Sequence, residues 1–235
     1  MKSNSFVNAM LGMLPLVFGL SGCNGLFDSF GGESQDLNSV NDLSEHVRSV
    51  HVESEIAKER LRLAVGALRD LTDPDFSGDP QAGFETFVLA IEASEKQAKA
   101  LRKRADPMVD AGARFFTSWT NDLDDFQGAE LRKRSKERMY ATRKLYKNVE
   151  HSVEAVQSNY DELNSRLRDY ATYLSNDFNA ASVASLAPDV RAVSQLAAKL
   201  DQRFELCLSS TSEYVASTGM FGQAVAAPEL VSNRD

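Results

Sequence analysis

Apolar residues recur at alternating steps of three and four along four long segments between residues 43 and 214. This spacing is the signature of left-handed supercoiled helices that pack knobs into holes. Four such segments joined by turns predict an all-α protein, an elongated antiparallel four-helix bundle with coiled-coil-like heptad packing. The inward positions are, in chain order, Leu43, Val47, Val50, Ser54, Ala57, Leu61, Ala64, Leu68 and Leu71; Phe84, Phe87, Ile91, Ser94, Ala98, Leu101, Ala105, Met108, Gly112, Phe115 and Trp119; Met139, Thr142, Tyr146, Val149, Val153, Val156, Tyr160, Leu163, Leu167, Tyr170 and Leu174; and Leu186, Val190, Val193, Ala197, Leu200, Phe204, Cys207, Thr211 and Tyr214.

Breaks in the pattern locate the turns between these helices. Residues 72–83 contain Asp-Pro twice, Gln127-Gly128 forms a tight turn, and residues 176–187 precede Pro188 in the first turn of the last helix. Asp106-Pro107 predicts a kink inside the second helix, with Asp106 capping the half that follows. The second and third helices are the longest, about 65 Å at ~1.5 Å per residue. The hairpin of helix 2 and helix 3 is therefore expected to protrude from one end.

The first 22 residues have a different character. Lys2 precedes an apolar run from Phe6 to Leu20, and small residues precede Cys23. The run is shorter than the roughly 20 residues of a membrane-spanning helix and indicates a secretory signal peptide. Leu20-Ser21-Gly22-Cys23 resembles the lipobox of bacterial lipoproteins, where cleavage precedes the cysteine and the thiol carries a diacylglyceryl group. An ordinary secretory signal is the alternative.

The lipobox resemblance implies a place for the protein. It implies a membrane anchor through Cys23 in the cell envelope, facing the periplasm. Asn24 is not the aspartate that marks inner-membrane retention in enterobacteria, so the resemblance favours the outer membrane. The chain then divides into a signal peptide (residues 1–22), a lipidated Cys23 with a flexible tether (23–40), a helical bundle domain (41–216) and a mobile C-terminal tail (217–235).

Charge and cysteine content narrow the function further. The net charge is −8, and loss of Lys2 with the signal peptide makes it −9. An acidic chain has no overall attraction for nucleic acid. With Cys23 lipidated, Cys207 has no partner for an internal disulfide. Its place in an apolar helical pattern predicts a buried structural thiol.

The second half of the chain carries a family resemblance. The matching stretches are residues 131–135 (Leu-Arg-Lys-Arg-Ser), 142–146 (Thr-Arg-Lys-Leu-Tyr) and 179–186, together with Leu174, Asn176 and an earlier turn formed by Phe76-Ser77-Gly78 with Phe84. These residues resemble an uncharacterised family of bacterial lipoproteins known only as a domain of unknown function. The resemblance implies a helical envelope lipoprotein and no particular activity.

Catalytic chemistry is not expected from this sequence. The three histidines, His46, His51 and His151, belong to no Glu-x-x-His pair, and no HExxH, CxxC, P-loop or G-x-S-x-G pattern occurs. His51 and Glu55 share a helix face, which is usually a solvated contact. The protein is therefore expected not to be an enzyme and to need no cofactor.

One loop has the first half of a calcium-binding pattern. Asp73, Asp75, Ser77 and Asp79 place side-chain oxygens at alternate positions, with Gly78 at the sixth. The twelfth position is Phe84 rather than the bidentate glutamate of an EF-hand. A plain turn is the favoured interpretation, and a weak calcium site is the alternative.

The protruding hairpin tip carries the candidate interaction surface. A two-helix tip is not expected to bury all its rings, and a basic run follows them. Asp122, Asp124 and Asp125 lie across the turn, so internal pairing of the basic run is the alternative. The predicted surface is Phe115, Phe116, Trp119, Phe126, Arg132, Lys133, Arg134, Lys136 and Arg138. The C-terminal tail, a second copy, a partner protein or the membrane interface could cover the rings.

Two functions are compatible with these features. The first is a non-enzymatic, lipid-anchored helical bundle of the cell envelope, a structural or protein-interaction module that contacts an envelope protein or a second copy. The second is an envelope ligand-binding module, with calcium in the 73–79 loop or an anionic ligand at the basic stretch 132–147. Nucleic acid is not an expected partner.

Overall fold

The computed structural model describes residues 33–218 as a chain of five helices with no strand among those residues. The helices are α1 (Glu33–Leu71), α2 (Pro80–Asp122), α3 (Ala129–Asn176), α4 (Ala180–Ser185) and α5 (Ala187–Thr218). The expected signal peptide, Cys23 and most of the expected tail lie outside the described residues. The all-helical class predicted from the sequence is confirmed.

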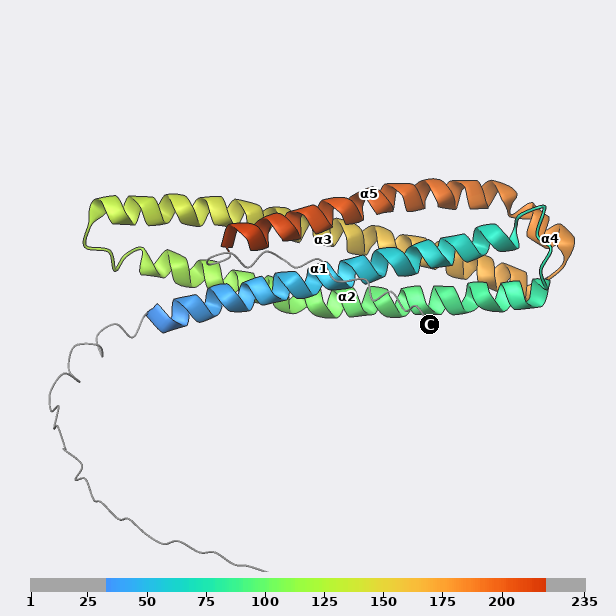
Figure 1. Ribbon diagram of the computed structural model, residues 1–235, viewed down its shortest axis with the longest axis horizontal. Helices are drawn as coiled ribbons and strands as arrows, with labels where there is room; N and C mark the ends of the chain where they lie inside the picture. Colours follow the sequence, from blue (N-terminus) through green and yellow to red (C-terminus); the bar gives the residue numbers. More distant parts are fainter. Residues whose placement is uncertain (1–32, 219–235) are drawn as a thin grey trace, which may run out of the picture.

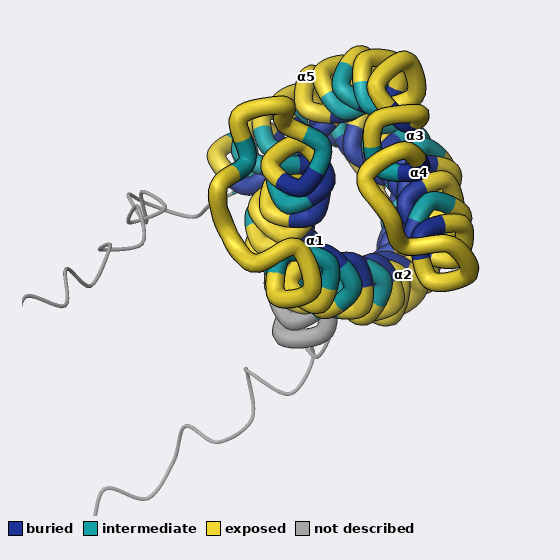
Figure 2. The backbone as a smooth tube through the Cα atoms, turned by 90° about the vertical axis from the view of Figure 1, so that its right-hand side faces the viewer, coloured by how far each residue is buried: buried dark blue, intermediate teal, exposed yellow. Residues whose placement is uncertain are grey.

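The four long helices lie side by side along one axis, and consecutive ones run in opposite directions (Figure 1). α1 contacts α2 and α5, and α3 contacts the same two helices from the other side. In the view along this axis, buried residues face inward and exposed residues face outward (Figure 2). The turn between α2 and α3 extends past the first residue of α1 and the last residue of α5 (Figure 1).

The heptad positions predicted from the sequence form the core. Nearly all of them are buried, and the five exceptions are half-buried: Phe84, Trp119, Tyr170, Val190 and Ala197. The core is wider than the predicted stripe, because Val65, Ala111, Phe116, Ala171 and Val215 are buried beside it. Aliphatic side chains dominate most of its length, while aromatic rings gather toward the α2–α3 turn. Burial of this continuous apolar strip is the main favourable term for folding.

Local side chains fix where the helices begin. Asp79 caps α2 by accepting the backbone N–H of Gln81 at 3.0 Å, and Pro80 occupies the first helical turn. Asn179 caps α4 in the same way, accepting two backbone N–H groups at 2.9 Å. Pro188 lies in the first turn of α5, as predicted. These caps satisfy amide groups that the helices themselves leave without partners.

Three boundaries differ from the sequence prediction. α1 begins at Glu33 rather than near residue 41, so residues 33–40 of the expected tether are helical, and Val40 packs against the core. α5 ends at Thr218, two residues into the expected tail. α4 adds a short helix to the expected 176–187 connection, because Asn179 offers its first turn a cap.

α2 continues through Pro107, so Asp106 caps no second helix there. Proline removes one hydrogen bond of the helix ladder, and burial of the neighbouring Ala105 and Met108 in the core holds the helix together there.

Candidate interaction surface

The predicted aromatic surface at the hairpin is largely core. Phe115 and Phe116 are only 5% and 3% exposed, so the expectation that they form an exposed surface is wrong. They belong to a row of rings that crosses three helices, in the order Trp119, Phe115, Phe116, Tyr146 and Tyr214, with centroid separations of 4.9–5.7 Å. The end of α5 reaches this level and supplies Tyr214 and Val215. Tyr214 of α5 packs against Tyr146, and α1 also reaches this level, where Asp42 lies 3.7 Å from Arg114, so the rings do not lie on a bare two-helix hairpin.

A missing side chain makes room for this aromatic row. A Cβ atom on Gly112 would lie 2.2 Å from both Cζ and Oη of Tyr146, closer than atoms of a folded protein approach. Tyr146 therefore lies directly against the backbone of α2, where its hydroxyl donates a hydrogen bond to the Met108 carbonyl at 2.8 Å. Burial raises the pKa of both Tyr146 and Tyr214. Gly112 is thus required by a close approach between α2 and α3.

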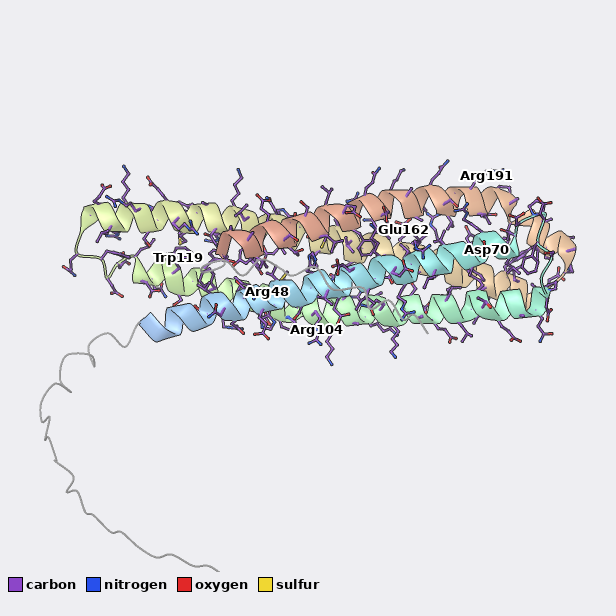
Figure 3. The ribbon with its side chains drawn as sticks, viewed as in Figure 1. Arg48, Asp70, Arg104, Trp119, Glu162 and Arg191 are labelled. Carbon is purple, nitrogen blue, oxygen red and sulfur yellow. The ribbon has the colours of Figure 1, made fainter. Side chains whose placement is uncertain are left out.

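Trp119 and Phe126 lie nearer to the turn itself. Trp119 is half-buried, and its indole N–H donates to Oγ of Ser135 at 3.0 Å, which joins α2 to α3. Figure 3 shows Trp119 on α2 close to the turn. Phe126 is 37% exposed in the turn. Of the four predicted rings, Phe126 is exposed and Trp119 is partly accessible.

The five predicted basic residues are all exposed at the beginning of α3. Arg132 pairs with Asp124 across the turn, as the alternative of internal pairing predicted. Arg134 lies 3.2 Å from Glu130, and Arg138 donates to the Ser217 carbonyl of α5 at 3.0 Å. Lys136 lies 5.8 Å from the ring centre of Tyr140. Within the described part of the chain, Lys133 and Lys136 have no carboxylate within 4.0 Å.

Two apolar residues of this surface were not predicted. Leu131 is 57% exposed and Tyr140 is 56% exposed, and both lie among the basic residues of α3. They fall outside the heptad positions. Apolar residues at non-heptad positions in a highly charged stretch are therefore the sequence signal that could have identified them. We define the basic tip as Phe126, Leu131, Arg132, Lys133, Arg134, Lys136, Arg138 and Tyr140.

Two of the four calcium candidates, Asp73 and Asp79, make hydrogen bonds to the backbone within the α1–α2 turn. Asp73 Oδ1 accepts the backbone N–H of Asp75 at 2.8 Å, and Asp79 caps α2. These bonds are typical of Asx turns and helix caps. Over the described residues, no group of three or more histidine, cysteine, aspartate or glutamate side chains could hold a metal ion.

The remaining predicted polar residues lie inside or beside the core. Cys207 is buried as predicted, 3.7 Å from Oγ of Ser54, and burial raises the pKa of its thiol. His51 Nε2 lies 3.7 Å from Glu55, and its Nδ1 lies 2.7 Å from the Thr211 hydroxyl. Ser94 links α2 to α3 by donating to Asn164 Oδ1 at 2.7 Å. The Tyr160 hydroxyl donates to the Ser94 carbonyl, and burial raises the pKa of Tyr160 to about 12.

Comparison with known proteins gives a family but no activity. No described helix is both long enough and apolar enough to cross a membrane. No curated protein matches the chain. Residues 32–218 match the model of a family described as protein of unknown function, DUF2959. Since this match spans most of the chain and every described helix, the protein belongs to the DUF2959 family.

Proposed function

We propose that the protein is a non-enzymatic, lipid-anchored helical bundle of the bacterial cell envelope, acting as a structural or protein-interaction module. Its four long helices form an antiparallel four-helix bundle with knobs-into-holes seams, and the basic tip is its contact surface. Cys23 carries the lipid that holds the protein to the membrane, facing the periplasm. The outer membrane is the favoured location, from Asn24.

The composition and position of the basic tip carry this proposal. The α2–α3 turn extends past the ends of α1 and α5, which leaves the tip open to a partner (Figure 1). Its exposed side chains combine apolar Leu131 and Tyr140 with Lys133 and Lys136, which have no carboxylate in reach among the described residues. Protein interfaces are enriched in aromatic residues and arginine, and charge complementarity selects the partner. The favoured partner is therefore an acidic protein surface.

Site-specific photocrosslinking in cells tests the proposed surface. A photoreactive residue at Leu131 is expected to give one discrete crosslinked species, which disappears when Lys133 and Lys136 are both changed to glutamate. Leu89 is a matched control, because it is at least as accessible (65% exposed) and lies on α2, outside the basic tip. Equal crosslinking from Leu131 and Leu89, or none from Leu131, would contradict the proposed surface.

Two further measurements test the other parts of the proposal. Cys23→Ser is expected to abolish incorporation of labelled palmitate and to release the protein from the membrane fraction. Unchanged membrane retention of that variant would contradict the lipid anchor. Light scattering of residues 24–235 at several concentrations distinguishes self-association from a different partner, because a dimer lost in the Lys133 and Lys136 variant makes the partner a second copy.

A further inference from the structure

The end of the molecule opposite the basic tip contains a pocket built from two turns that are far apart in the sequence. The α1–α2 turn supplies Leu71, Thr72, Asp73, Pro74, Phe76 and Pro80, and the α3–α5 connection supplies Phe178, Asn179, Ala180, Val183, Ala184 and Ala187. We call this cavity the end pocket. Its volume of about 520 Å³ lies within the range of small-molecule sites. Both segments include the residues that carry the family resemblance, at positions 76–78 and 179–186.

The aromatic walls of the end pocket are held in place by their neighbours. A Cβ atom on Gly78 would lie 2.9 Å from Cζ of Phe76, and one on Gly83 would lie 3.0 Å from the same atom. The two glycines therefore let the Phe76 ring lie against the turn. Phe178 packs against Phe84 of α2 with a centroid separation of 5.1 Å. The three lining alanines of the other wall have small side chains, so the space is left open by the sequence itself.

Polar groups around the end pocket are mostly occupied as donors. The Thr72 hydroxyl donates to the Leu68 carbonyl at 2.8 Å. Asn179 Nδ2 donates to Asp177 at 2.6 Å, and its Oδ1 accepts two backbone N–H groups. Asp73 uses one carboxylate oxygen in the turn, which leaves the other as an acceptor. A ligand would therefore meet acceptors more readily than donors.

The charge around the end pocket is negative. Asp73 is its one ionisable lining residue, and the lining contains no lysine or arginine. A smaller recess shares Thr72, Asp73 and Ala187 with it and adds Arg69 and Asp70, so carboxylates outnumber cations there too. Figure 3 shows Asp70 near this end of α1. A ligand with a carboxylate or phosphate would be repelled, and one with an ammonium group would be attracted.

The described ends of the chain lie away from this pocket. α1 begins and α5 ends toward the basic tip (Figure 1). We propose that the end pocket binds the hydrocarbon chain of a small amphiphile whose polar end is a hydrogen-bond donor, an alkylammonium above all and an alkyl alcohol next. The chain fills the apolar cavity, and the polar end faces Asp73. This site is independent of the proposed contact at the basic tip.

Three ligands of equal chain length provide the test. Decylammonium, decanol and decanoate are titrated at pH 7 into the protein by calorimetry and by displacement of a neutral fluorescent probe, N-phenyl-1-naphthylamine. Decylammonium is expected to bind more tightly than decanoate by about twofold to thirtyfold, because attraction of the cation to Asp73 and repulsion of the anion by it are each worth about 1.4-fold to fivefold. Decanol is expected to lie between them. Equal or tighter binding of decanoate would overturn the proposal, as would no binding of any of the three.

Two pairs of variants locate the binding. Ala184→Trp fills the end pocket and is expected to abolish binding, whereas Ala181→Trp, on the same short helix but outside the lining, is expected to leave it intact. Asp73→Asn is expected to remove most of the preference for ammonium over alcohol, and Asp75→Asn is its control. Both alanines are exposed, so circular dichroism is expected to show unchanged helix content. Equal effects of the two variants of either pair would overturn the assignment. It would also be overturned if the protein bound no amphiphile and formed a dimer that Ala184→Trp disrupts.

Discussion

The two ends of the molecule use aromatic residues in opposite ways. Toward the basic tip, Phe115, Phe116, Tyr146 and Tyr214 are all buried; Tyr214 of α5 packs against Tyr146, and Gly112 lets α2 and α3 approach. At the other end, Phe76 and Phe178 line a pocket that is also lined by three alanines. The same residue type therefore closes one end and leaves the other open. What decides is the size of the side chains that line each end.

The largest expected effect separates a core ring from a pocket ring. Phe116→Ala removes a buried ring and is expected to cost about 3–5 kcal/mol of unfolding free energy. Phe178→Ala removes a ring that is 38% exposed, and is expected to cost less than about 1.5 kcal/mol. Urea denaturation of both variants measures the difference. Similar losses would mean that the two ends are packed alike, which would break the comparison.

The next largest effect on stability is expected where α2 and α3 approach closely at Gly112. Gly112→Ala places a methyl group against the Tyr146 ring, and overpacking of this kind costs about 1–3 kcal/mol. Gly66→Ala is the matched control, because a Cβ atom there meets nothing within 4 Å. That change is expected to stabilise α1 by about 0.5–1 kcal/mol, as alanine does in a helix interior.

A double variant tests whether the loss of stability in Gly112→Ala comes from a clash with Tyr146. Tyr146→Leu in the Gly112→Ala background removes the ring that the new methyl group meets. The combined loss is therefore expected to be smaller than the sum of the two single losses, and thermal unfolding of all four proteins measures this. Strict additivity would show that Gly112 serves some purpose other than admitting Tyr146.

The sequence predicts the inward face of each helix well. Leu101, Val153 and Phe204 were assigned to the core from spacing alone, and all are buried. Spacing reports the direction of a side chain on its own helix, however, and not how far the neighbouring helices extend. Phe116 packs against Tyr146, which packs against Tyr214 of α5, and α1 reaches the same level, where Asp42 lies 3.7 Å from Arg114. These contacts join residues far apart in the chain, which no local pattern records.

The end pocket was also beyond reach of the sequence analysis, for a related reason. Its walls come from two turns, and each turn contains only ordinary turn residues such as Pro74, Gly78 and Asn179. The pocket follows from the way these turns face one another across the end of the helices. The early start of α1 was not predicted because residues 33–40 show no sustained helical spacing of apolar residues; Val40, at the end of this segment, packs against the core.

The protein is expected to become less stable at alkaline pH. Burial raises the pKa of Tyr146, Tyr160 and Tyr214 above the value of about 10 for tyrosine in an unfolded chain. Above pH 10 the unfolded chain therefore loses protons that the folded protein keeps. The unfolded state then binds fewer protons, so stability falls as pH rises.

The variant Tyr214→Phe measures how much of the unfolding free energy lost at alkaline pH is due to Tyr214. Removing one hydroxyl that stays protonated in the folded state is expected to spare about 1.4 kcal/mol at pH 11, and nothing at pH 8. Denaturant unfolding of both proteins at the two pH values provides the comparison. An identical loss in the variant would mean that the folded protein lets Tyr214 ionise.

The smallest expected effect distinguishes two hydroxyls within the aromatic row at neutral pH. The Tyr146 hydroxyl donates to the Met108 carbonyl at 2.8 Å, so Tyr146→Phe is expected to cost about 0.5–1.5 kcal/mol. The Tyr214 hydroxyl is buried and has no hydrogen-bond partner among the described residues. Tyr214→Phe removes an unsatisfied polar group and is expected to be neutral or slightly stabilising at pH 7. Thermal unfolding of the two variants ranks them, and a loss at Tyr214 equal to that at Tyr146 would show that Tyr214 has a partner in solution. If the ranking holds, ring packing is what closes the core at Tyr214, while at Tyr146 a hydrogen bond to the neighbouring helix adds to it.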